Sequence, residues 1–122
     1  NYYNKIFGDS YYESLSTNSN IRIHSSTFST GEAGIVVVNI SDKEEIVEIE
    51  LKNIAAKESA GVFEIYNKNP NSRKTGINNF FNNNDAGGPK NFKKIKANQL
   101  IIKNNVIKLV SKPYSANYIL SK

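Results

Sequence analysis

Apolar and polar residues alternate with a period of two along much of the chain, and this pattern predicts β-strands. Ile21 and Ile23 alternate with Arg22 and His24, as expected for a half-buried strand. Residues 33–40 (AGIVVVNI) form a short, nearly continuous β-branched run, which is typical of a strand in the middle of a sandwich. No segment shows a 3.6-residue apolar repeat long enough for a helix of more than about one turn.

A strand with one polar face follows the β-branched run. The segment 46–51 (IVEIEL) has apolar residues on one face and Glu48 and Glu50 on the other. The turn residues 41–44 (SDKE) join it to the segment 33–40, so these two strands predict an antiparallel hairpin.

Four more strands are predicted in the second half of the chain. Residues 99–103 and 106–110 flank an Asn-Asn pair that tolerates the positive φ of a tight turn, so they predict a second hairpin. Residues 62–66 alternate in the same way, and the chain closes with a strand over 114–120. Residues 54–60 are consistent with one helical turn.

This series of short strands predicts an all-β fold, an antiparallel β-sandwich of about seven or eight strands. The length of 122 residues suits one domain over 1–122, with 1–19 as an N-terminal segment or edge strand. In that segment, adjacent tyrosines such as Tyr11 and Tyr12 should point to opposite faces. Because the chain begins at Asn1, we expect it to be a piece of a longer protein.

Composition excludes several kinds of site. The chain has no cysteine, so it forms no disulfide and no thiolate metal site. Its only histidine, His24, lies on the polar side of a strand, and the glutamates follow strand alternation, so neither predicts a catalytic group. We therefore expect no enzyme activity and no cofactor. Structural calcium at 82–85 (NNND) is an alternative to a plain polar loop.

The positive charge is concentrated in the long segment 67–96, which is predicted to be a loop. It holds seven Lys or Arg and one Asp, a net charge of +6, while the whole chain carries +5. Such charge fits nucleic acid, an anionic membrane or an anionic polysaccharide, unless it serves only solvation. The sequence has no amphipathic basic helix, zinc-finger spacing or RNP motif, so we expect neither nucleic acid nor membrane as partner.

The segment 67–96 also combines residue types that bind sugars. Aromatic faces pack on the apolar faces of pyranose rings, amides satisfy hydroxyls, and Arg and Lys bind sulfate or carboxylate substituents. The predicted ligand-binding residues are Arg73, Lys74, Asn78, Phe80, Phe81, Asn82 and Lys90. One of the two phenylalanines is expected to anchor the loop and the other to stack on a sugar.

Several motifs resemble one group of known domains. They are GEAGIVVVNISDKEEIVEIEL (31–51), Ser72-Arg73-Lys74, Gly87-Gly88-Pro89, Asn91-Phe92, Ile95-Lys96-Ala97 and the ending KLVSKPYSANYIL (108–120). Over about 21–120 they resemble the C-terminal β-sandwich accessory or carbohydrate-binding domains that follow the catalytic barrel of bacterial glycoside hydrolases, of the agarase, porphyranase and galactanase kind. The chain departs from that pattern at 78–84 (NNFFNNN).

The resemblance implies a secreted or cell-surface bacterial domain that either binds polysaccharide or supports a barrel. The first hypothesis is a monomeric, non-catalytic module that binds a sulfated algal galactan such as porphyran or carrageenan, with neutral agarose or xylan as a variant. The second is a structural domain that packs on the catalytic barrel and binds no sugar. The third is an immunoglobulin-like interaction domain with an exposed edge strand.

Overall fold

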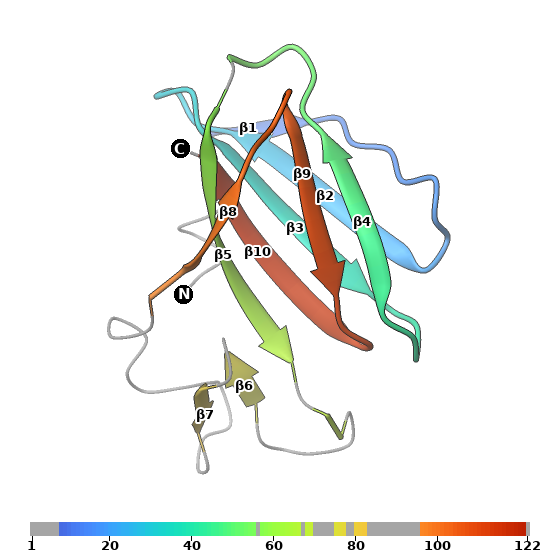
Figure 1. The fold of residues 1–122 in the computed structure, drawn as a ribbon. Coiled ribbons are helices and arrows are strands. Elements are labelled where there is room, and N and C mark those ends of the chain that lie inside the picture. Colours follow the sequence, from blue (N-terminus) through green and yellow to red (C-terminus); the bar gives the residue numbers. More distant parts are fainter. Residues whose placement is uncertain are drawn as a thin grey trace.

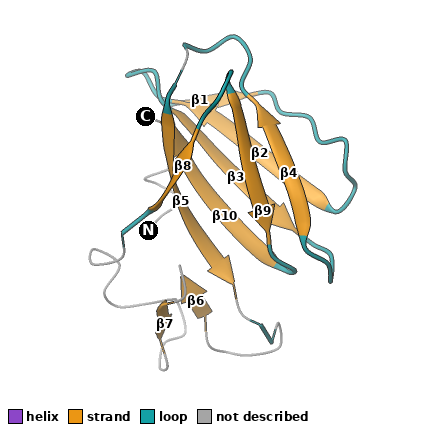
Figure 2. Cartoon of the chain, viewed as in Figure 1, coloured by secondary structure: helices purple, strands orange, loops and turns teal. Residues whose placement is uncertain are grey.

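The computed structural model is an antiparallel β-sandwich, as the sequence predicts. It describes residues 8–55, 57–66, 68–69, 75–77, 80–82 and 96–121. In these residues there are ten strands and no helix (Figure 2). The strands are β1 (Ser10–Tyr12), β2 (Ile21–Thr27), β3 (Ala33–Asn39), β4 (Glu45–Glu50), β5 (Ser59–Tyr66), β6 (Thr75–Ile77), β7 (Phe80–Asn82), β8 (Asn98–Ile101), β9 (Val106–Ser111) and β10 (Ser115–Ser121).

The strands form two sheets of unequal width. The larger sheet has the order β1-β2-β3-β10-β5-β6-β7, and β8 pairs with an earlier part of β5 than β6 does. The smaller sheet consists of β4 and β9. The smaller sheet lies over the middle strands of the larger one, whereas β6 and β7 lie beyond the end of β5 (Figure 1).

The core lies between the two sheets and follows the period-2 pattern. Ile35 and Val37 of β3 face Ile49 of β4 and Ile107 of β9, and each of these side chains is 6% exposed or less. Their outward neighbours on the smaller sheet, such as Glu48, are exposed. The buried cluster comprises Ile21, Ile35, Val37, Ile49, Leu51, Ala60, Val62, Ile102, Ile107, Leu109 and Ile119.

In the N-terminal part of the sandwich, β1 lies at the edge of the larger sheet. β1 pairs with β2 alone, and Tyr11 is 74% exposed whereas Tyr12 is half-buried. The β-branched run behaves as predicted, because β3 lies between β2 and β10.

Both predicted hairpins are wrong, although the strands themselves are present. β3 has β2 and β10 on its two edges, so it has no edge left for β4, and the chain crosses to the smaller sheet instead. In the second case β8 pairs with β5 and β9 pairs with β4; only the bridge between Lys103 and Val106 joins the two segments.

The predicted Asn-Asn turn is present, and the predicted helical turn is not. Asn104 and Asn105 have φ values of 51° and 58°, so the predicted left-handed turn is confirmed. The predicted helical turn over 54–60 is wrong: the described residues there are irregular until β5 begins at Ser59. The predicted loop over 67–96 contains the two short strands β6 and β7.

No helix that could cross a membrane occurs in the described part of the chain.

Candidate functional site

The structure describes only part of the predicted ligand-binding residues. Phe80, Phe81 and Asn82 constitute β7, where the structure describes the backbone. The other predicted residues, Arg73, Lys74, Asn78 and Lys90, lie outside the described residues, as do the possible calcium ligands Asn83, Asn84 and Asp85. The roles given to all these side chains therefore stay predictions.

The end of β5 is the point from which the basic segment leaves the sandwich. Tyr66 is the last residue of β5, and 67–96 follows it directly. β6 pairs with this same end, with Ile65 opposite Ile77 and Tyr66 opposite Gly76. The larger sheet therefore extends into the basic segment at this place, which makes the end of β5 the anchor of any site there.

A lysine from another part of the chain reaches the end of β5. Lys112 Nζ, from the turn between β9 and β10, donates a hydrogen bond of 2.8 Å to Glu64 Oε1. The same ammonium lies 4.8 Å from the centroid of the Tyr66 ring, within cation–π range. The side chains of Lys112 and Glu64 are 34% and 15% exposed, so the ion pair is largely shielded from water.

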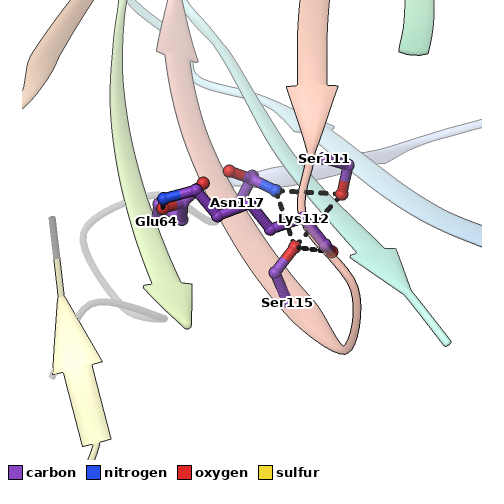
Figure 3. Close-up of polar contacts among 5 residues, drawn as sticks. All are labelled: Glu64, Ser111, Lys112, Ser115 and Asn117. Atoms are coloured by element: carbon purple, nitrogen blue, oxygen red, sulfur yellow. Dashed lines mark hydrogen bonds and ion pairs between the residues drawn. The ribbon is translucent and has the colours of Figure 1, made fainter. Parts of the chain in front are cut away.

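A buried network of hydrogen bonds fixes the turn that carries Lys112 (Figure 3). Ser115 Oγ donates to the Lys112 carbonyl at 2.7 Å, and the hydroxyl oxygens of Ser111 and Ser115 lie 3.2 Å apart. Asn117 Nδ2 donates to Ser111 Oγ at 3.3 Å, and these side chains are at most 2% exposed. Because buried polar groups are costly without partners, the network favours a single conformation of the turn.

A second buried amide ties the neighbouring turn to the first. Asn39 Nδ2 donates to the carbonyl oxygens of Lys43 at 2.8 Å and Ser111 at 3.1 Å. Asn39 Oδ1 accepts from the backbone N–H of Ser41 at 2.9 Å. The Asn-Ile-Ser turn that contributes to the resemblance of 31–51 is therefore a structural feature, because Asn39 is 1% exposed.

Exposed apolar side chains lie at the same end of the sandwich. Ile46 and Val110 are directly opposite each other on the outer face of the smaller sheet and are 76% and 52% exposed. Ile40 and Tyr114, in the two turns, are also exposed, and the Tyr114 N–H donates to the Ser41 carbonyl at 3.1 Å. Tyr114 has a φ of 49°, which is uncommon for an aromatic residue.

A cavity of about 740 Å³ lies beside β4, and residues of β2 and of the segment 13–18 also line it. Its lining includes the apolar residues Ile23 and Ile35 and the polar segment 13–18. The two ends of this segment are attached to β4 and the residues after it. The Tyr12 hydroxyl donates to the Lys52 carbonyl at 2.7 Å, and Asn18 Nδ2 donates to Glu45 Oε2 at 3.1 Å. The cavity is thus an opening into the core that the attached segment 13–18 borders.

The acidic groups of the described residues are dispersed. They form no group of three or more metal-ligating side chains in the part of the chain that the structure describes. Two exposed carboxylates have lowered pKa values: Asp9, because the backbone N–H of Ser29 donates to it at 2.8 Å, and Glu32, chiefly because the Thr30 hydroxyl donates to it. Both contacts lie in exposed loops next to β1, β2 and β3. Glu48 and Glu50 are exposed, as their strand alternation predicted.

Sequence reasoning missed the Lys112–Glu64–Tyr66 cluster. One signal was present: Glu64 shares a strand face with Val62, which is a core position. An acidic residue on a core face predicts a cationic partner. The partner itself was not predictable, because Lys112 is 48 positions away along the chain.

Comparisons with known proteins relate the fold to glycoside hydrolases. No protein-family model matches the sequence, and no functionally curated protein matches it. Among solved structures, the chain is similar to CelM2, a bifunctional glucanase-xylanase from a metagenome library, with 15% identity and a TM-score of 0.65. It is also similar to a family 44 endoglucanase from Clostridium acetobutylium ATCC 824, with 14% identity and a TM-score of 0.66.

A third similar structure is the arabinose-bound α-L-arabinofuranosidase MgGH51, with 12% identity and a TM-score of 0.67. The three matches cover 94%, 94% and 97% of this chain but only 18%, 19% and 17% of the hydrolase chains. At these identities the likeness shows the fold. The chain spans about a fifth of the length of each hydrolase.

Proposed function

We propose that this β-sandwich is a non-catalytic accessory domain of a glycoside hydrolase and that it binds polysaccharide. The observation that carries the proposal is the difference in coverage between the two chains of each match. Nearly all of this chain superposes on about a fifth of several hydrolase chains. A domain of this kind leaves catalysis to the remainder of the enzyme. It would act as a monomer in a secreted or cell-surface bacterial enzyme.

The charge of 67–96 supports an anionic polysaccharide as the ligand. This segment, with its net charge of +6, follows directly on β5. Sulfate groups bind well to Arg and Lys, so a sulfated galactan such as porphyran or carrageenan is the proposed ligand. In this proposal Arg73, Lys74 and Lys90 bind sulfate, while the amides and phenylalanines of 78–82 contact the sugar itself.

Native affinity electrophoresis through gels that contain porphyran, carrageenan, agarose or xylan tests this function. We compare the wild type with two variants that lose the same charge: Arg73→Ala with Lys74→Ala, and Lys103→Ala with Lys108→Ala. Lys103 and Lys108 are exposed cations outside 67–96.

Retardation by a sulfated gel that survives moderate salt, and that only the Arg73/Lys74 variant loses, is the expected result. Equal loss in both variants, or retardation that vanishes at moderate salt, would indicate nonspecific charge attraction because exposed ion pairs are screened. If no gel retards the wild type, polysaccharide binding is refuted.

A structural role against the catalytic part of the enzyme is the second candidate function. The exposed apolar residues Ile40, Ile46, Val110 and Tyr114 favour it, because they lie together at one end of the sandwich. In this case the isolated domain should bind the dye ANS, and replacing Ile46 and Val110 with Thr should abolish dye binding without unfolding the domain. A wild type that binds no dye would remove the support for this candidate.

A further inference from the structure

In the part of the chain that the structure describes, the smaller sheet is narrower than the larger one and leaves part of it without a strand above it. The smaller sheet has only β4 and β9 in the described residues, and it lies over the middle strands of the larger one (Figure 1). β6 and β7 extend the larger sheet beyond the end of β5, away from both of these strands. The turn after β9 reaches this end through Lys112, which forms the ion pair with Glu64.

The residues of β5 show which face of this extension looks toward the smaller sheet. Val62, Glu64 and Tyr66 alternate along β5, so they share one face. Val62 belongs to the core, and Glu64 is bound by Lys112 from the side of the smaller sheet. Tyr66 therefore lies on the inner face, at the margin of the sandwich, with the Lys112 ammonium over its ring.

The strand register continues the row of Tyr66 into the basic segment. Tyr66 is opposite Gly76 of β6, and Gly76 is opposite position 81 of β7. Residues directly opposite one another in an antiparallel sheet share a face. Position 81 is therefore in the row of Tyr66, whereas position 80 is in the row of Ile77 and Ile65, which belongs to the outer face.

We propose that Tyr66, Gly76 and position 81 form one row of a sugar-binding platform, with the Lys112–Glu64 pair at its end and the Lys112 ammonium over one face of the Tyr66 ring. This inference rests on the polysaccharide binding proposed above and specifies its site. It also decides between the two adjacent phenylalanines: Phe81 is assigned to the sugar and Phe80 is not.

The row has the composition that a stacking platform requires. Its two aromatic positions are two strands apart, which corresponds to about 10 Å at the usual strand spacing. That span is wider than one pyranose ring, and the glycine between the two positions contributes no side chain that would block a flat ligand. Lys112 supplies a cation at the end of the row, and Glu64 holds it there at 2.8 Å.

Single-tryptophan reporters test the platform sharply because the chain contains no tryptophan. We prepare Tyr66→Trp, Phe81→Trp and Phe80→Trp, each of which keeps an aromatic residue at its position. Each variant is titrated with soluble porphyran and, in parallel, with agarose-derived oligosaccharides, while tryptophan fluorescence is recorded. Phe80→Trp is the matched control, because it differs from Phe81→Trp by one position and by the face of the sheet.

We expect the fluorescence to shift to shorter wavelength on sugar addition for the reporters at 66 and 81 and to stay unchanged at 80. As a second measurement, Phe81→Ala should weaken binding about tenfold and Phe80→Ala less than about twofold. A response at 80 with silence at 66 and 81, or equal losses in the two alanine variants, would overturn the inference while the binding function stands. A wild-type protein that no polysaccharide gel retards would refute the function and the platform together.

Discussion

Replacing Lys112 with Met should destabilise the domain by about 2 kcal/mol. Exposed ion pairs contribute about 0.2–1 kcal/mol, whereas removal of one partner from a fully buried pair costs about 3–5 kcal/mol. The Glu64 side chain is 15% exposed and the Lys112 side chain 34%, so this pair lies between the two limits. The variant also loses the contact of the ammonium with the Tyr66 ring.

A double-mutant cycle separates the pair from other effects of each substitution. Glu64→Gln keeps the shape of the side chain and should cost about 1 kcal/mol. The double variant should be less destabilised than the sum of the single variants, by a coupling energy of about 1 kcal/mol, because the two residues are in direct contact at 2.8 Å.

Urea unfolding followed by circular dichroism measures these free energies. In thermal scans, 1 kcal/mol should correspond to about 3–5 °C for a chain of this size. The matched control is Lys108→Met, which removes a lysine 3.6 Å from Glu48 with side chains 76% and 64% exposed. We expect its effect to be below about 0.5 kcal/mol. The reasoning is refuted if the two lysine variants are equally destabilised, or if the coupling energy is below about 0.3 kcal/mol.

Three further predictions concern the core, the close approach of Gly8 to β2, and pH. In urea unfolding, Ile107→Val should cost about 0.5–1.5 kcal/mol and Ile46→Val almost nothing, because the two side chains are 0% and 76% exposed; equal effects would contradict the burial. Gly8→Ala should cost about 1–3 kcal/mol in the same assay, because the new Cβ would collide with the backbone of β2; a neutral effect would contradict this close approach. Asp9→Asn should lower stability at neutral pH, since the N–H of Ser29 lowers the Asp9 pKa below 3.8. The stabilising contribution is present above that value and disappears as pH falls through the lowered pKa, so unfolding curves of the two proteins should converge in acid.

The fold class was predictable from the sequence, but the pairing of the strands was not. Period-2 alternation depends on burial of one face, which is a local property, so the main strands were found near their true positions. Pairing depends on which edge is available. β3 uses both edges for β2 and β10, and β10 is the last strand of the chain. A turn sequence therefore cannot show whether the chain stays in one sheet or crosses to the other.

The candidate site was predictable in composition and not in geometry. The concentration of cations, amides and phenylalanines in 67–96 is visible in the sequence. The choice between Phe80 and Phe81 depends on the register of β5, β6 and β7, and one step of register exchanges the faces. The contribution of Lys112 depends on a contact across 48 positions, which no local pattern contains.

The arrangement of the core explains how stability and binding can be separated in this domain. The buried cluster reaches along β5 only as far as Val62, whereas Glu64 and Tyr66, further along the strand, are half-buried. On β5, the buried cluster of the described residues therefore ends before the basic segment begins. Folding does not depend on Tyr66 in the way it depends on Ile107 or Ile119, so Tyr66 can contact a ligand, whereas Glu64 contributes to stability through Lys112. For the same reason, substitutions in the row of Tyr66 should change affinity for polysaccharide with little change in the free energy of unfolding.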